Sequence, residues 1–161
     1  MIPTGVDLRT TQNSNRILQK ILDTTRESVL VVDADMRIVG LNSPAVDIFG
    51  RGAELQGKRL SEVVRDLDLH EAFRQTIFSH ASSEIRLELN NVDRRFDVHV
   101  APLELDGEMR GIGFFYETTK IERLESIRQE FLSNISHELR TPLTSILAFV
   151  ETLEDGAIDD D

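Results

Sequence analysis

The spacing of hydrophobic residues changes sharply after Thr119, and that change limits the folds open to this chain. Between residues 85 and 116, apolar side chains recur at every second position, which is the period of β-strands with one buried face. From residue 120 to about Leu153 they recur at three- and four-residue intervals, which is the period of an α-helix. A helical pattern beyond about 25 residues without internal caps is typical of a coiled coil. The sequence therefore predicts a sheet-containing domain followed by one long helix.

The segment before the helix is expected to be an α+β domain, with helices on one face of an antiparallel sheet. Residues 1–13 are polar and contain proline and glycine, which indicates a loose lead-in, so the domain is expected to span residues 14–119. Its predicted elements, in order, are an amphipathic helix from Ser14, a hairpin of residues 29–32 and 37–41, a compact helix capped by Ser43, helices near residues 60–65 and 69–79, and three meandering strands within residues 85–116.

The predicted helix of residues 120–153 carries an apolar stripe along one side. At about 100° per residue, the central positions of the stripe fall on one line. Such a stripe is expected to form a dimer seam or a bundle core. Gly156 and the acidic residues around it predict a loop over residues 154–161. The stripe consists of Leu132, Leu139, Ile146 and Leu153, flanked by Ile135, Leu143 and Val150.

His137 lies about 160° from the centre of this stripe, so its side chain is expected to face solvent. The pair His137-Glu138 begins the zinc-protease pattern H-E-x-x-H. Thr141 stands where the second histidine ligand belongs, and a hydroxyl does not replace imidazole there. We therefore expect no metal site. A chance surface histidine is the plainer alternative for any lone exposed imidazole.

The neighbours of His137 indicate nucleophilic chemistry. A neutral imidazole has one ring nitrogen with a free lone pair, and Glu138 can accept a hydrogen bond from the other ring nitrogen while the first one reacts. Thr141 lies one turn further along the same face. Pro142 has no amide hydrogen, so it leaves the carbonyl of Glu138 without its usual partner and predicts a bendable point beside the site.

The composition excludes several other functions. The formal net charge of −11 argues against nucleic acid or an anionic membrane as the partner. The absence of cysteine removes disulfides, thiol nucleophiles and cysteine–flavin adducts, and it suits a cytoplasmic location. No apolar run has the length of a membrane span. We expect a packed core rather than a ligand pocket, with His70, His80 and His99 exposed rather than binding haem.

Two stretches resemble known families. The element order of residues 14–119, with "GLNSPAVDIFG" after the first hairpin, resembles a PAS sensor domain. Glu117-Thr118-Thr119 stands where many PAS domains have an Asp-x-Thr relay motif, which implies a domain-to-helix junction but, with the longer acid, no particular salt bridge. "FLSNISHELRTPLTSI" resembles the H-box of sensor histidine kinases of the H-E-x-x-T-P type. The sequence that continues from it is most similar to the phosphate-regulon, PhoR-type group.

The H-box resemblance implies roles for the three residues that precede the hinge expected at Pro142. His137 would be the phosphoacceptor, Glu138 the acid/base, and Thr141 the residue that positions water for phosphatase action. The resemblance also implies a homodimer through the helix of residues 120–153. It further implies a response regulator as partner and an ATP-binding domain that uses ATP and Mg²⁺ in a longer parent.

Only eight residues follow Leu153, so the ATP-binding domain and the second bundle helix are expected to be absent. We therefore expect the chain to be inactive alone and to hold no cofactor of its own. Anchoring of the parent in the inner membrane through other segments is left open. The alternative function is a PAS-type dimeric binding and signalling module whose helix only oligomerises. Phosphoryl transfer to His137 would separate the two.

Overall fold

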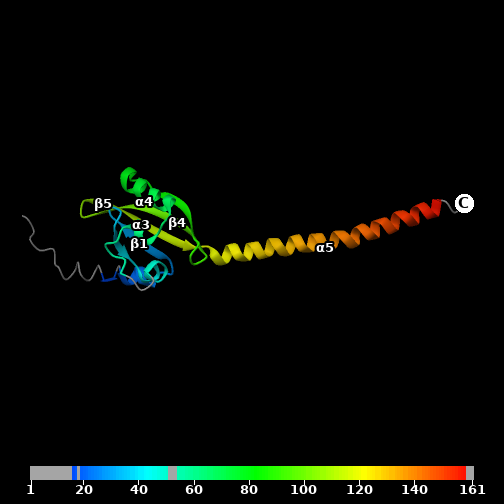
Figure 1. Cartoon of the computed structure of the whole chain (residues 1–161), viewed down its shortest axis with the longest axis horizontal. Helices are drawn as coiled ribbons and strands as arrows, with labels where there is room; N and C mark the ends of the chain where they lie inside the picture. The colour runs from blue at the N-terminus through cyan, green and yellow to red at the C-terminus, as the bar shows by residue number, and fades with distance from the viewer. Residues whose placement is uncertain (1–15, 18, 51–53, 159–161) are drawn as a thin grey trace, which may run out of the picture. The chain divides into compact units, whose positions relative to one another are not determined.

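The computed structural model describes residues 16–17, 19–50 and 54–158. The lead-in expected over residues 1–13 lies outside this part. The chain divides into two compact units, Met1–Thr119 and Lys120–Asp161. The first unit contains the sheet and its short helices, and the second contains nearly all of the long helix (Figure 1).

The first unit is built on a five-stranded antiparallel sheet with the strand order β2-β1-β5-β4-β3. The expected hairpin of β1 and β2 and the expected meander of β3, β4 and β5 are both confirmed. β1 pairs with β5, where Ser28 lies opposite Phe115 and Leu30 opposite Gly113, so the first and last strands are neighbours. The strands are β1 (Ser28–Val32), β2 (Ile38–Leu41), β3 (Ser83–Leu89), β4 (Arg94–Leu105) and β5 (Glu108–Glu117) (Figure 1).

Short helices pack on one face of this sheet and enclose the hydrophobic core. In α4, Leu69 and Phe73 are one turn apart and both are fully buried in that core. Before the sheet, residues 16–17 and 19–24 are helical, in agreement with the helix expected from Ser14. The labelled helices are α2 (Ser43–Ala45), the π-helical η1 (Val46–Gly50), α3 (Leu60–Val63) and α4 (Leu67–Ser79).

Asn42 caps α2, so the expectation that Ser43 is the cap is wrong. Asn42 Oδ1 accepts hydrogen bonds from the amides of Ala45 at 3.1 Å and Val29 at 2.9 Å. Asn42 has the extended backbone of an N-cap, with φ −96° and ψ 172°, whereas Ser43 is already helical. The Ser43 hydroxyl donates instead to Asp23 Oδ1 at 3.0 Å. Both residue types favour caps, so composition alone did not separate the two positions.

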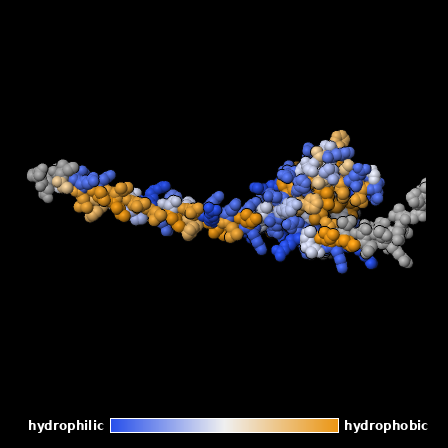
Figure 2. All heavy atoms as spheres, turned by 180° about the vertical axis from the view of Figure 1, so that it is seen from behind, coloured by the Kyte–Doolittle hydropathy of each residue, from blue (hydrophilic) through white to orange (hydrophobic). Residues whose placement is uncertain are grey.

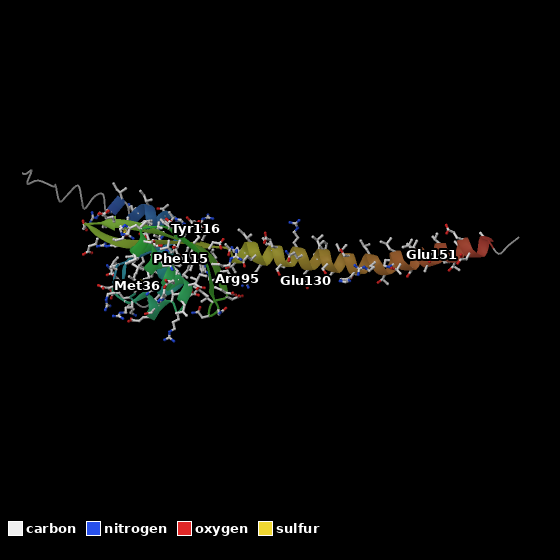
Figure 3. The ribbon with its side chains drawn as sticks, turned by 90° about the horizontal axis from the view of Figure 1, so that it is seen from above. Met36, Arg95, Phe115, Tyr116, Glu130 and Glu151 are labelled. Atoms are coloured by element: carbon white, nitrogen blue, oxygen red, sulfur yellow. The ribbon has the colours of Figure 1, made fainter. Side chains whose placement is uncertain are left out.

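The buried face of β5 carries Gly111, Gly113 and Phe115. A Cβ atom added at Gly111 would lie 2.8 Å from Phe73 Cδ1, and one added at Gly113 would lie 2.7 Å from Phe73 Cζ. The two glycines therefore let the Phe73 ring lie directly on the backbone of β5. Tyr116 falls on the opposite face of the strand and is 45% exposed; it is labelled together with Phe115 in Figure 3.

The long helix predicted from the sequence is confirmed as α5 (Thr119–Ile158) (Figure 1). Pro142 lies inside it. The loop expected over residues 154–161 is wrong for its first part, because α5 continues through Gly156 to Ile158. A glycine within a helix costs only about 1 kcal/mol relative to alanine, so Gly156 alone does not end the helix. Residues 159–161 lie outside the description. None of the helices in the described residues is long and apolar enough to cross a membrane.

Candidate functional site

α5 carries all four predicted site residues on its surface. His137, Glu138, Thr141 and Pro142 are each exposed, so the expectation of a solvent-facing imidazole agrees with the structure. His137 and Thr141 are four residues apart and therefore lie one turn apart on the same face of the helix. Glu138 is turned about 100° from His137 around the helix axis. The fold thus brings His137 and Thr141 together and places Glu138 on the adjacent face.

The hydrogen bonding of the α5 backbone differs from that of an ordinary helix on both sides of His137. Pro142 has no amide hydrogen, so the carbonyl of Glu138 lacks its usual helical donor. The Ser145 hydroxyl donates to the Thr141 carbonyl at 3.0 Å, and the Ser136 hydroxyl donates to the carbonyl four residues before it at 2.9 Å. Such bonds compete with the helix ladder and often bend helices. α5 is nevertheless continuous through this region, from Thr119 to Ile158.

An apolar band runs along α5. Figure 2 shows hydrophobic residues along most of the visible side of the helix. Leu132 is 51% exposed and Leu153 is 58% exposed, so the stripe predicted from the sequence is uncovered in the single chain. The apolar band begins nearer the start of α5 than the stripe predicted from the sequence, whose first residue is Leu132. Exposed apolar residues also occur nearer the start of the helix, at Ile121, Leu124, Ile127 and Phe131.

The end of β5 is joined to β4 by an ion pair that the sequence analysis did not predict. Arg94 Nε donates to Glu117 Oε1 at 3.0 Å and Arg94 Nη2 donates to Glu117 Oε2 at 2.6 Å. These hydrogen bonds raise the pKa of Arg94. Thr118 N donates to the Arg95 carbonyl at 2.9 Å, and Arg95 N donates to Thr119 Oγ1 at 2.9 Å. All three residues of the expected junction are thus held to β4.

A local sequence pattern could not have found this ion pair, because Arg94 and Glu117 are 23 residues apart in the chain. The available signal was the strand register. In the β4–β5 pairing Phe96 lies opposite Glu117, so the start of β4 faces the end of β5. An arginine at that start is long enough to reach the acid, and its planar fork matches a carboxylate.

The other three histidines lie in the first unit. His80 is exposed, as expected, but His70 and His99 are half-buried, contrary to expectation. His70 Nε2 lies 2.9 Å from the Val64 carbonyl oxygen, and His99 Nδ1 lies 3.4 Å from Glu84 Oε1. Each contact joins a histidine to a residue outside its own helix or strand, so the periodicity of a single element does not show it. Within the part of the chain that the structure describes, no three histidine or acidic side chains form a group that could hold a metal ion.

Comparison with known proteins gives the same division of the chain. Residues 16–119 match the PAS fold, and residues 127–161 match the His Kinase A (phospho-acceptor) domain. The sensor protein kinase WalK of Staphylococcus aureus (strain Newman) is 28% identical, over 94% of this chain and 25% of WalK. The phosphate regulon sensor protein PhoR of Pseudomonas aeruginosa is 30% identical, over 94% of this chain and 35% of PhoR. The chain thus spans about a quarter to a third of the length of these relatives.

A solved structure supports the fold of the first unit. The PAS domain of nitrogen regulation protein NR(II) from Vibrio parahaemolyticus superposes with a TM-score of 0.54 at 18% sequence identity. The match covers 63% of this chain and 97% of that domain. At this identity the likeness concerns the fold alone.

Proposed function

Because the chain belongs to the PAS fold family and carries a His Kinase A phospho-acceptor domain, we propose that it is the sensor and phosphoacceptor portion of a two-component histidine kinase. Its curated relatives include sensor histidine kinases, so the family resemblance read from the sequence is confirmed. The observation that carries the proposal is the exposed His137 on α5, inside the matched phospho-acceptor segment, with Glu138 and Thr141 beside it.

His137 is the proposed phosphoacceptor. The lone pair of one ring nitrogen attacks the γ-phosphorus of ATP, a nitrogen–phosphorus bond forms, and the bond from phosphorus to the oxygen of the leaving ADP breaks. Glu138 takes the proton from the other ring nitrogen, so the phosphorylated ring ends neutral. The exposure of His137 supports this role, because a nucleotide held by another domain has to reach the ring.

Thr141 is proposed to take part in dephosphorylation of the response regulator. Its hydroxyl lies one turn from His137 on the same face, where it can orient a water molecule toward the phosphorylated aspartate of a bound response regulator. Replacing Thr141 with alanine should therefore slow dephosphorylation of the regulator by on the order of 10²-fold and leave most phosphorylation of His137 intact. Pro142 is proposed as the hinge that lets a signal reshape this face.

The apolar band of α5 supports a parallel homodimer. Leucine and isoleucine side chains that are more than half exposed along several turns are costly to leave in water, and pairing two copies of the helix would cover them. A parallel arrangement also lets two identical PAS domains lie side by side.

The remaining parts of the reaction are proposed to come from outside this chain. ATP and Mg²⁺ would be held by an ATP-binding domain of a longer parent protein. A response regulator would then take the phosphoryl group from His137 onto an aspartate. On this proposal the chain alone is inactive, in line with its coverage of only 25% and 35% of two kinase relatives.

A chimera tests the proposal directly. This chain, joined in register to the C-terminal remainder of the Pseudomonas aeruginosa PhoR protein, should take up acid-labile, alkali-stable phosphate from ATP and Mg²⁺ and pass it to that protein's response regulator. The chain without the added segments should take up none. If the chimera stays unlabelled under conditions in which PhoR itself is labelled, the chain is better described as a PAS-type dimeric module whose helix only oligomerises.

A further inference from the structure

Arg140 is a single positive charge on an otherwise acidic stretch of α5. It is the only lysine or arginine between residues 129 and 161, and every other formally charged side chain of that stretch is an aspartate or a glutamate. Arg140 follows His137 by three residues, and its side chain is exposed. A phosphoryl group that approaches a helix surface of this charge is itself negative, so a nearby cation favours its arrival.

The usual structural roles of an arginine on a helix do not account for Arg140. Surface arginines commonly pair with an acid three or four residues away. The positions at those distances hold Ser136, His137, Leu143 and Thr144. None of them is acidic. Basic residues also stabilise the last turn of a helix, but α5 continues to Ile158. Among the residues that the structure describes, the Arg140 side chain has neither a hydrogen-bond partner nor an ion-pair partner.

The helix places Arg140 and Glu138 on opposite sides of His137. At about 100° per residue, Glu138 is turned about 100° from His137 in one direction and Arg140 about 60° in the other. Residues three apart are neighbours on a helix surface, whereas residues two apart do not face each other. Glu138 therefore does not neutralise Arg140. A group bound to the His137 ring has the guanidinium on one side and the carboxylate on the other.

We propose that Arg140 binds the phosphoryl group while it is transferred to His137. This inference rests on the proposed role of His137 as the phosphoacceptor. Two guanidinium N–H groups donate to phosphoryl oxygens, in the bidentate geometry that arginine forms with phosphate. The nitrogen–phosphorus bond forms and the bond to the leaving ADP breaks, while Arg140 makes no covalent bond and stays protonated. Arg140 is thus a catalytic residue that stabilises negative charge on the transferred group.

Phosphoramidate tests the contact in this chain itself, because this small phosphoryl donor modifies histidine without an ATP-binding domain. After treatment, the NMR signal of the Arg140 Nε–H should move downfield and exchange with water more slowly, since the guanidinium has gained an anionic acceptor. The Arg128 Nε–H signal is the internal control and should not change, because Arg128 lies nine residues before His137, on the opposite side of the helix.

Treatment of His137→Gln with phosphoramidate shows whether the change depends on His137 rather than on another histidine. The Arg140 signal should stay unchanged in this variant. An unchanged Arg140 signal in the parent chain, with phosphate present on His137, would overturn the proposed contact.

The chimera with the PhoR segments tests the effect of Arg140 on the reaction. Arg140→Gln should lower the rate of labelling at saturating ATP on the order of tenfold or more. The KM for ATP should stay unchanged, because the added domain holds ATP. Arg140→Lys keeps the charge without the planar fork, so it should recover part of the rate. Arg128→Gln removes the same charge from the opposite side of α5 and should leave the rate unchanged.

A purely structural role for Arg140 would change other properties. Since the side chain is exposed, Arg140→Gln should retain the circular dichroism spectrum, the melting temperature and the dimer content of the parent chimera. A full labelling rate in Arg140→Gln, or an equal loss in Arg128→Gln, would overturn the proposal. An unlabelled parent chimera would count against the phosphoacceptor function instead, and the NMR measurement after phosphoramidate treatment would still decide for or against Arg140.

Discussion

Two parallel hydrogen bonds join the guanidinium of Arg94 to the carboxylate of Glu117, at 3.0 Å and 2.6 Å. Arg94 is the first residue of β4 and Glu117 is the last residue of β5. The Arg94 guanidinium also lies over the Phe96 ring, 5.8 Å from its centroid. α5 begins at Thr119, two residues after Glu117. The ion pair therefore fixes the last residue of the sheet immediately before the helix starts.

The coupling between Arg94 and Glu117 should be measurable in a double-mutant cycle. Both side chains are about one-third exposed and the geometry is bidentate, so we expect up to about 1 kcal/mol of coupling in urea unfolding of the Arg94→Gln and Glu117→Gln variants. The Arg86–Asp97 pair is the matched control. Its side chains are more exposed and 3.4 Å apart, so its coupling should be a few tenths of a kcal/mol, about the lower end for exposed pairs. Equal couplings would contradict a special role for the first pair.

Gly113→Ala should destabilise the first unit by about 1–3 kcal/mol, the usual cost of overpacking a core. The new methyl group would lie 2.7 Å from Phe73 Cζ and 3.1 Å from Phe115 Cε2. Gly156→Ala is the control, because nothing lies within 4 Å of its added methyl group, and it should raise helix stability by up to about 1 kcal/mol. Chemical denaturation measures both. A Gly113→Ala protein as stable as the parent would show that Phe73 does not rest on β5.

The same glycine explains part of what the sequence could and could not predict. Period-two alternation in residues 85–116 was enough for the meander, because the inner residues of β3 and β4 are large and apolar. On β5 the inner positions include Gly111 and Gly113 beside Phe115, so Ile112, Phe114 and Tyr116 lie on the outer face. Which face is buried depends on Phe73 of α4, which is distant in sequence. Hydrophobicity alone could not show that dependence.

The candidate site on α5 was more predictable than the junction before it. His137, Glu138 and Thr141 lie within one helix, where spacing determines the face that each residue occupies. The Arg94–Glu117 pair depends on the register between two strands, which no local pattern determines. The C-terminal end of α5 lies beyond the end predicted from the local glycine signal, at Ile158 rather than near Leu153. Glycine is common after helices, but Gly156 lies within α5 without a left-handed backbone, and the helix continues to Ile158.

Asp23 should have a pKa below the 3.8 usual for its side chain. The main cause is the hydrogen bond from the Ser43 amide at 2.9 Å, followed by that from the Ser43 hydroxyl at 3.0 Å. Because the folded pKa is depressed, this contact stabilises the fold above about pH 3.8, and the stabilisation is lost as the pH falls through the lower folded value. An NMR titration of the Asp23 carboxyl group measures this pKa. Ser43→Ala removes the hydroxyl but keeps the hydrogen bond from the residue 43 amide, so the pKa of Asp23 should rise only part of the way to 3.8. A pKa of 3.8 or above for Asp23 in the parent protein would refute the Asp23–Ser43 contact.

Light scattering should show a dimer of this chain at tens of micromolar or above, the range in which weak self-association of about −6 kcal/mol becomes visible. Leu139→Lys places a charge in the apolar band and should shift the protein toward monomer. Ser133→Lys, one turn from His137 on the polar face, adds the same charge outside the band and should leave the dimer intact. A monomeric parent protein, or equal effects of the two variants, would rule out the band as the dimer interface.

The most direct measurement of the central claim is the site of phosphate labelling in the chimera with the PhoR segments. We expect His137→Gln to abolish acid-labile, alkali-stable label while the circular dichroism spectrum and the melting temperature stay unchanged, because the side chain is exposed. Thr141→Ala, an equally exposed substitution one turn away, should retain most of the label. Label that persists in the His137→Gln protein would place the phosphoryl group on another residue and contradict the assignment of His137 as the phosphoacceptor.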